Sequence, residues 1–176
     1  FRFVERVRDE RIVLEANTIG SGASGRNGGQ LIPGLRWQMS DLHKALGEDR
    51  AKAIFDLCWR NPSRVVERIK AHQIDCDYAL GHIEAAMSDK SLRYLSREAE
   101  WLERKYGYKT DILDRAAMGR EVASGAYYAG VLDLNGGHIH PLNYLLGLAA
   151  ELVKAGGIIA EQAAVHQLEQ VNHKVV

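Results

Sequence analysis

The sequence predicts a mixed fold of helices and strands, of the α/β or α+β class. Apolar residues recur with helical spacing over three long segments, at about 41–73, after Ser88 and after Pro141. Between these segments lie short apolar runs bounded by glycine or polar residues, which is the pattern of strands. The composition agrees with a globular domain, because 46% of the 176 residues are hydrophobic and 26% are charged.

The first half of the chain gives these elements in order. Apolar side chains in residues 1–8 have roughly helical spacing, and Arg11–Glu15 reads as a short strand. A loop over 16–35 is followed by a helical region from Asp41 to Gln73, interrupted at Asn61-Pro62 because proline lacks the N–H that a helix needs. Two short strands, 74–78 and 82–86, are expected around Gly81.

In the second half, Ser88 is expected to cap a helix that ends before Gly107. A strand near 110–113, a helical turn near 115–122 and a strand over 126–134 follow. Residues 136–141 are expected to open a further helix, with Pro141 in its first turn. That helix ends at Gly156-Gly157, and 158–161 and 164–169 read as closing strands.

Charge and composition exclude several classes of function. Lysine plus arginine equals aspartate plus glutamate, 23 against 23, which argues against a nucleic-acid partner. No apolar run reaches the roughly 18–20 residues of a membrane span, and the best candidate, 142–153, contains Glu151. Cys58 and Cys76 form neither a disulfide framework nor a C-x-x-C pair, and residues 1–10 match no signal or transit peptide, so a cytoplasmic protein with reduced thiols is expected.

The most informative segment is a strand that ends in an acid and leads into a glycine-rich loop. In a dinucleotide-binding βαβ unit, a carboxylate at the end of the second strand accepts hydrogen bonds from ribose hydroxyls, and Glu15 fits that role. Residues 20–29 contain five glycines, whose backbone N–H groups can approach an anion, while Ser24 and Arg26 can donate to phosphate oxygens. Asn27 offers a donor and an acceptor to the edge of a flat ring. A flexible surface loop has the same composition and stays an alternative.

Three stretches carry a resemblance to a known family. Residues 13–17 and 19–31 resemble the second strand and flavin loop of the D-amino-acid oxidase-like superfamily of FAD-dependent oxidoreductases. Within them, Gly-Ala-Ser-Gly-Arg-Asn-Gly-Gly-Gln at 22–30 is most similar to the gamma-glutamylputrescine oxidase branch. The other matches are Leu132–Tyr144 and Ala155–Glu161 followed by Val165, and the three occur in the family's order.

The resemblance implies FAD as cofactor and a small-molecule amine as substrate. The implied reaction is oxidation of a C–N bond, as in gamma-glutamylputrescine, with release of an aldehyde, ammonia and hydrogen peroxide. It places Glu15 at the adenosine ribose, Ser24 and Arg26 near the diphosphate, and Val165 at adenine through its main chain. The complete set of implied cofactor-binding residues is Glu15, Ala16, Ser24, Arg26, Asn27, Gly28, Gly29, Gln30, Leu31 and Val165. No catalytic residue is assigned.

The same comparison implies a partial domain organisation. Residues 1–40 are expected to be a remnant of the FAD-binding βαβ unit, 41–135 part of a substrate region, and 136–176 a return to the FAD-binding domain. The family's G-x-G-x-x-G would precede Glu15 by about 20 residues, which places it before residue 1, and its C-terminal half is also expected to be missing. A homo-oligomer or a complementary segment would then cover the exposed apolar edges. A non-catalytic binding or interaction module is the alternative function.

Other features have competing interpretations. His138 and His140 have a spacing that can chelate a metal, but no metal site is expected. Local hydrogen bonding at the start of the helix is favoured, and a position near the substrate is the alternative. Asp75-Cys76-Asp77 is interpreted as a buried cysteine between two solvent-facing acids rather than a cation site or activated thiol. Trp59, Tyr127 and Tyr128 fit an apolar amine pocket and core packing equally well.

Overall fold

The computed structural model describes residues 12–59, 61–168, 170–171 and 174–175. The predicted helical residues 1–8 lie outside this range. The chain forms two compact units, within Phe1–Gly29, Arg68–Asp77 and His140–Val176 for the first, and Gln30–Glu67 and Tyr78–Ile139 for the second. The assignment of residues 1–40 and 136–176 to an FAD-binding domain and of residues 41–135 to a substrate region stays a prediction. Among the residues described, no helix combines the length and apolar character needed to cross a membrane.

The first unit contains a parallel pair of strands and a helix between them in sequence. β1 (Ile12–Leu14) pairs with β6 (Ile158–Ala160) in the register Ile12 to Ile158, and α6 (Pro141–Lys154) precedes β6. The end of α3 (Asn61–His72) also belongs to this unit, and β7 (Gln170–Val171) pairs antiparallel with β8 (Lys174–Val175). The side chains of β1 are 44–55% exposed. That a second copy of the chain or another segment covers these exposed side chains stays a prediction.

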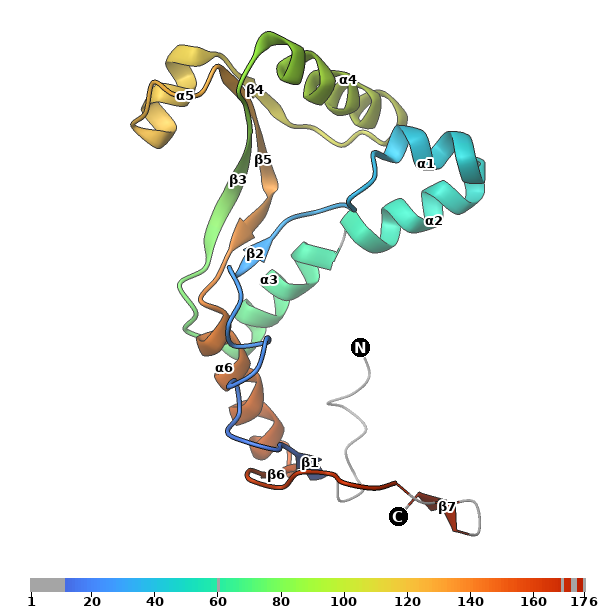
Figure 1. Ribbon diagram of the computed structural model, residues 1–176, viewed down its shortest axis with the longest axis vertical. Coiled ribbons are helices and arrows are strands. Elements are labelled where there is room, and N and C mark those ends of the chain that lie inside the picture. The colour runs from blue at the N-terminus through green and yellow to red at the C-terminus, as the bar shows by residue number, and fades with distance from the viewer. Residues whose placement is uncertain (1–11, 60, 169, 172–173, 176) are drawn as a thin grey trace. The chain divides into compact units, whose positions relative to one another are not determined.

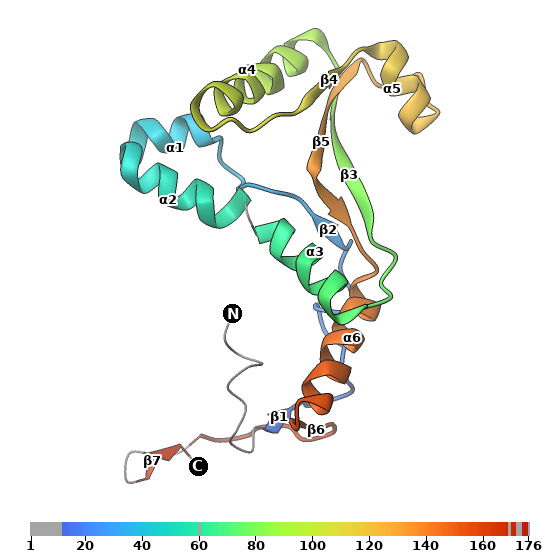
Figure 2. The ribbon, with the colours of Figure 1, turned by 180° about the vertical axis from the view of Figure 1, so that it is seen from behind.

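The second unit contains an antiparallel sheet built on β5 (Ala129–His138). β3 (Ala79–Ala86) runs along one edge of β5, as Figure 1 and the reverse view in Figure 2 show. Leu132 pairs with both β3 and β4 (Asp111–Leu113), and His138 pairs with both β3 and β2 (Gln30–Leu31), so β2 and β4 share the other edge of β5. β5 is therefore the central strand that positions the other three.

Helices of the second unit enclose its hydrophobic core. Met39 and Leu42 of α1 (Met39–Leu46), Phe55 of α2 (Glu48–Trp59) and Leu102 of α4 (Asp89–Tyr106) are buried together. The ring of Phe55 stacks on that of Tyr106 with centroids 4.2 Å apart. The short helix α5 (Arg115–Val122) begins after Asp114, whose carboxylate accepts the Ala117 N–H at 2.7 Å. Burial of these aromatic and aliphatic surfaces is the main stabilising contribution to this unit.

The predicted ends of helix α4 are confirmed. The Ser88 hydroxyl accepts the Ser91 N–H, and the Ser91 hydroxyl accepts the Ser88 N–H, so both orphan donors are satisfied. Gly107 adopts a left-handed conformation with φ 67°, and its N–H bonds the Glu103 carbonyl. Asn61-Pro62 lies in the first turn of α3, which begins at Asn61, while α2 ends at Trp59. The residue between the two helices lies outside the described residues, so the predicted interruption stays a prediction.

Four strand predictions are wrong in part. The strand expected over 126–134 begins instead at Ala129 and continues to His138. Residues 74–78 form no strand. Ile74 is buried against Gly147 of α6, and the Cys76 carbonyl accepts the His140 N–H, so the alternating pattern reflects the packing of Ile74 and Cys76 without ladder pairing. The expected strand over 82–86 is longer, since β3 starts at Ala79 and continues through a register shift at Gly81. Residues 164–168 of the predicted closing strand have no ladder partner among the described residues.

Residues 136–138 were expected to open the third helix but belong to β5. Gly136 and Gly137 are required there because β5 is flanked closely on both edges. A Cβ on Gly137 would lie 2.3 Å from the Ala79 carbonyl oxygen of β3, and one on Gly136 would lie 2.7 Å from the Leu31 oxygen of β2. The helix itself begins at Pro141, which occupies its first turn as predicted.

A hydrogen-bonded pair joins α3 to α6 in the first unit. His72 Nδ1 lies 2.7 Å from Glu151 Oε2, and the hydrogen bond from His72 lowers the pKa of the Glu151 carboxyl below its ordinary value. The carboxylate therefore stabilises the fold above the ordinary carboxyl pKa, and this contribution is lost as the pH falls through the lowered value. We expect His72→Ala to raise the Glu151 pKa toward the ordinary range, measured by carbon NMR titration of its side chain.

Lys154 provides the matched control for the Glu151 titration, because it lies 3.3 Å from the other Glu151 oxygen on the same helix. Lys154→Ala should raise the Glu151 pKa less than His72→Ala does, since His72 is the larger cause of the lowering. An unchanged Glu151 pKa in the His72→Ala protein would show that the pair does not form in solution.

Candidate functional site

Glu15 directly follows β1, and hydrogen bonds fix both its backbone N–H and its backbone carbonyl. Its backbone N–H donates to the Ala160 carbonyl at 2.9 Å, and its own carbonyl accepts the Ala163 N–H at 2.9 Å. Carboxylate oxygen Oε1 accepts the Asn17 N–H at 2.9 Å. The other carboxylate oxygen has no hydrogen-bond partner in the described part of the chain. Glu15 thus presents a fixed acceptor at the carboxyl end of a parallel strand, which is where ligands bind in open α/β sheets.

The segment after β6 fixes the start of the glycine-rich loop. The Glu161 carboxylate accepts the Ile19 N–H at 2.6 Å, and the Gln162 N–H donates to the Asn17 carbonyl at 2.9 Å. Sequence reasoning did not single out Glu161, although an acid directly after a short strand, as at Glu15, was a usable signal. Val165 follows three residues later and is 54% exposed. Its predicted main-chain contact with adenine stays a prediction.

The loop over 18–29 has a defined set of internal hydrogen bonds. The Gly25 N–H donates to the Gly22 carbonyl at 3.2 Å, and a Cβ on Gly25 would lie 2.2 Å from the Gly20 carbonyl oxygen. Asn27 closes the loop, because Nδ2 donates to the Ala23 and Ser24 carbonyls at 3.0 Å and Oδ1 accepts the Gly29 N–H at 2.8 Å. Only a residue without a side chain fits at position 25.

The polar side chains of this loop divide into two groups. The Asn27 side-chain amide forms hydrogen bonds within the loop. A contact between Asn27 and a flat ring would therefore have to come from its backbone atoms, and this contact stays a prediction. The Ser24 and Arg26 side chains are exposed and have no side-chain partner in the described ranges. Ala16 and Gly28 are exposed and Gly29 is buried with φ 66°. Hydroxyl and guanidinium donors beside backbone N–H groups suit an anionic ligand.

Gln30 and Leu31 belong to the second unit, where they form β2 and pair with His138 and Gly137 of β5. The two predicted binding residues are therefore part of a sheet, while residues 15–29 belong to the first unit. Their predicted contacts beside a flavin ring stay a prediction.

The histidine pair shows the local role that was favoured. His140 is the N-cap of α6, and its Nδ1 accepts the Asn143 N–H at 3.2 Å. His138 is an exposed residue at the end of β5. Over the described ranges, no group of three or more His, Cys, Asp or Glu side chains is placed to hold a metal ion. Cys76 is 1% exposed between exposed Asp75 and Asp77, as predicted.

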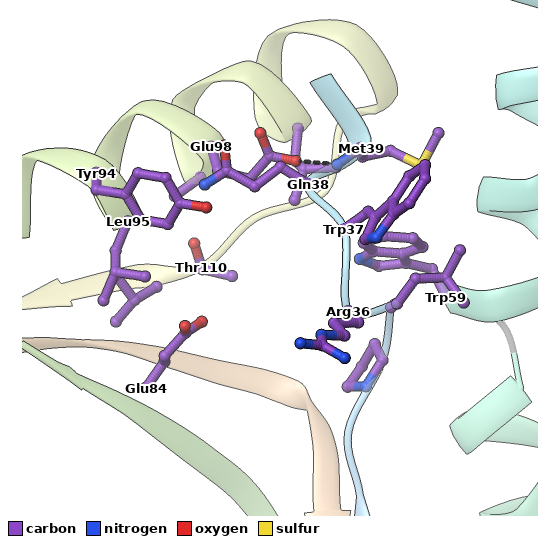
Figure 3. Close-up of a pocket in the computed structure, with 16 residues that line it drawn as sticks. Arg36, Trp37, Gln38, Met39, Trp59, Glu84, Tyr94, Leu95, Glu98 and Thr110 are labelled. Atoms are coloured by element: carbon purple, nitrogen blue, oxygen red, sulfur yellow. Dashed lines mark hydrogen bonds between the residues drawn. The ribbon is translucent and has the colours of Figure 1, made fainter. Parts of the chain in front are cut away.

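The second unit contains a cavity of about 200 Å³ beneath α4 (Figure 3). The loop before α1, residues of α4, and strands β3 and β5 line it, and Trp59 forms part of its wall. Trp59 also stacks on Phe55 with centroids 5.1 Å apart, so it serves both the cavity and the core. Tyr127 and Tyr128 do not line this cavity. Sequence reasoning missed its charged residues, Arg36, Glu84 and Glu98, which are far apart in the sequence and belong to no local motif.

A part-buried hydrogen-bond network lies next to Thr110 and Val131, two of the residues that line this cavity. Asp133 of β5 is 7% exposed and accepts the Tyr108 hydroxyl at 2.6 Å and the Asn135 N–H at 2.8 Å. The Asn135 amide also donates to the Lys109 carbonyl at 3.3 Å. Burial, reinforced by Asp133, raises the pKa of the Tyr108 phenol, which stays protonated and donating. The network fixes the segment that carries Thr110 into the cavity.

The sequence of this chain matches the family profile DAO, described as FAD dependent oxidoreductase, over residues 6–176. The chain belongs to the FAD-dependent oxidoreductases. FAD is the cofactor of this family, which confirms the predicted cofactor class. The mixed helix-and-strand fold predicted from the sequence is confirmed as well.

Two curated relatives show which branch of the family this FAD-dependent oxidoreductase chain resembles. It is 42% identical over 165 residues to Gamma-glutamylputrescine oxidoreductase of Escherichia coli K12, and 34% identical over 162 residues to Probable oxidoreductase OrdL of Haemophilus influenzae. The alignments cover 94% and 92% of this chain but 39% and 38% of the relatives. The chain therefore spans about two fifths of their length.

Solved structures share the fold at low sequence identity. L-amino acid deaminase from Proteus myxofaciens matches with TM-score 0.76 and 18% identity, over 98% of this chain and 37% of that one. Glycine oxidase from Geobacillus kaustophilus matches with TM-score 0.73 and 18% identity, over 96% of this chain and 44% of that one. At this identity the likeness establishes the fold alone.

The residues of the first unit fit the family cofactor by the chemistry of their polar groups. A dinucleotide needs an acceptor for ribose hydroxyls and donors for its diphosphate. Within the described part of the chain, one Glu15 carboxylate oxygen has no hydrogen-bond partner, and the Ser24 and Arg26 side chains are donors without one. Acceptor and donors lie within a dozen residues of one another, on a segment that Glu161 and Asn27 hold in place.

Proposed function

We propose that the polypeptide carrying this chain oxidises the primary amine of a γ-glutamylated diamine. The overall reaction converts the amine, O2 and water into an aldehyde, ammonia and hydrogen peroxide. The observation that carries the redox part is the hydrogen-bonded loop that follows Glu15 in a chain of the FAD-dependent family. Support for the substrate comes from the 42% identity to the E. coli enzyme named for gamma-glutamylputrescine. A cytoplasmic location is part of the same proposal.

In this proposal, different residues of the first unit bind different parts of FAD. Glu15 would accept hydrogen bonds from the ribose hydroxyls, and Ser24 and Arg26 would donate to the diphosphate. When bound, FAD supplies the two-electron acceptor that takes the hydride from the carbon bearing the amine. The chain's own contribution is to bind and orient the reactants, because orientation lowers the barrier without any covalent role for the protein.

We expect FAD to raise the thermal stability of this chain and Arg26→Gln to weaken FAD binding by about tenfold, since a hydrogen bond to a charged group contributes about 1.5–3 kcal/mol. Isothermal titration calorimetry measures the dissociation constants. Arg120→Gln is the matched control, because Arg120 is an exposed arginine of α5 outside the loop.

Equal FAD affinity in the Arg26→Gln and Arg120→Gln proteins would contradict the role of Arg26. An FAD titration without heat and without a shift in melting temperature would contradict cofactor binding by this chain.

The substrate is tested on the polypeptide that carries this sequence, by following peroxide release. γ-Glutamylputrescine should be oxidised with a higher kcat/KM than putrescine or free amino acids. Activity confined to amino acids would overturn the amine assignment. FAD binding without turnover of any of these compounds would favour the alternative, a non-catalytic flavin-binding module.

A further inference from the structure

The cavity of the second unit presents two opposite charges that do not pair with each other. Arg36 and Glu84 both line it, and Figure 3 shows their side chains entering the space from different walls. Neither side chain makes an ion pair within 4.0 Å among the residues described. Because the Arg36 guanidinium and the Glu84 carboxylate face one cavity and do not pair with each other, both are available to a ligand.

Arg36 lies on a loop that is fixed at both ends. On one side, Gly34 has φ 108° and packs so closely on Trp59 that a Cβ would lie 3.0 Å from its ring. On the other side, Glu98 of α4 accepts the N–H of Met39 at 2.5 Å. Glu98 thereby caps α1, whose own N-cap residue provides no side-chain hydrogen bond. The position of the Arg36 backbone is therefore set before any ligand binds.

Glu84 is the cavity carboxylate for which the described residues provide no hydrogen bond or ion pair. It lies in β3 and pairs with Val131 of β5, so the sheet fixes its backbone. The other cavity carboxylate, Glu98, is already engaged by Met39 and by the N–H and hydroxyl of Ser40, the hydroxyl at 2.6 Å. Consequently Glu84, and not Glu98, is the acceptor available to a positively charged ligand group.

We propose that this cavity binds the α-amino-acid end of a γ-glutamyl compound, with the ligand carboxylate on Arg36 and its ammonium group on Glu84. Charge-assisted hydrogen bonds of this kind are the strong ones in proteins, and a guanidinium matches a carboxylate in geometry. The cavity of about 200 Å³ is smaller than the roughly 300–1,000 Å³ of pockets that enclose a whole ligand, so it suits one end of a longer molecule. The γ-glutamyl part of the assignment rests on the proposed function.

The rest of the lining suits the stem of such a ligand. Trp37 and Trp59 supply aromatic surface for methylene groups, and Tyr94 and Thr110 place hydroxyls in the same wall. Trp37 is 65% exposed, so the cavity is open to solvent beside this residue. A purely cationic diamine would leave Arg36 unpaired beside it, which disfavours such a ligand.

The test titrates this chain, without FAD, with N5-methyl-L-glutamine and follows binding by NMR. Two analogues each lack one charge: N-methylglutaramic acid has no ammonium group, and 4-amino-N-methylbutanamide has no carboxylate. Arg36→Gln should weaken binding of the zwitterion by about tenfold and change the affinity for 4-amino-N-methylbutanamide less than about twofold. Glu84→Gln should also weaken binding of the zwitterion by about tenfold. It should change the affinity for N-methylglutaramic acid, which has no ammonium group, less than about twofold.

Arg120→Gln and Glu121→Gln are the matched controls, since both residues are exposed on α5 and outside the cavity. Circular dichroism of each variant verifies the fold. The proposal is overturned if the zwitterion binds Arg36→Gln and Glu84→Gln as tightly as it binds the controls, or if it perturbs no amide of the cavity residues. Equal affinity for glycine would overturn the γ-glutamyl assignment. Because FAD is absent, failure of flavin binding or turnover does not affect this result.

Discussion

Replacing Gly25 with alanine is expected to open the glycine-rich loop. The new Cβ would lie 2.2 Å from the Gly20 carbonyl oxygen, and a backbone atom cannot rotate away as a side chain does. Overpacking of this kind costs about 1–3 kcal/mol, which corresponds to a roughly 5- to 150-fold larger open population. Trypsin cleavage after Arg26 measures that population directly, because the scissile bond lies within the loop. We expect cleavage to accelerate and FAD affinity to fall by a comparable factor.

Gly22→Ala is the control for this experiment. No atom lies within 4 Å of a Cβ at Gly22, and the residue does not adopt a positive φ. The Gly22→Ala protein should therefore be cleaved at nearly the wild-type rate. Equal cleavage rates for the two variants would show that the closed loop is not the form present in solution.

Replacing Asp133 with alanine is expected to destabilise the second unit by about 2–4 kcal/mol. The Tyr108 hydroxyl and the Asn135 N–H would lose their acceptor in a site where Asp133 is 7% exposed. Both hydrogen bonds are part-buried, so donors that lose the Asp133 carboxylate are only incompletely rehydrated. Urea unfolding followed by tryptophan fluorescence measures the change, since all three tryptophans, at positions 37, 59 and 101, lie in the second unit.

Asp111→Ala is the matched control, because Asp111 is an exposed residue of the neighbouring strand β4. Its unfolding midpoint should stay close to that of the wild type. Tyr108→Phe should cost less than Asp133→Ala, since it leaves Asp133 with the two Asn135 donors at 2.8 and 2.9 Å. A midpoint for Asp133→Ala that equals that of Asp111→Ala would contradict the network.

Local sequence was sufficient for elements whose ends are set by nearby residues. Ser88 and Gly107 marked the ends of α4 because capping depends on contacts three or four positions away. The strand at residues 74–78 was predicted incorrectly for the opposite reason. Its alternation of apolar and polar residues matched a strand, but a strand also needs a ladder partner, and Cys76 instead bonds His140 across 64 positions.

By itself, the sequence determined the family, the cofactor class and the segment from Glu15 through the glycine-rich loop. Each of these features is a pattern of neighbouring residues, so it can be recognised from the sequence without a structure. Only the tertiary structure decided why Gly25 must lack a side chain, which carboxylate caps α1, and that Arg36 and Glu84 face one cavity. Those relations join residues that are distant in sequence, and long-range packing sets their approach because no local motif encodes it.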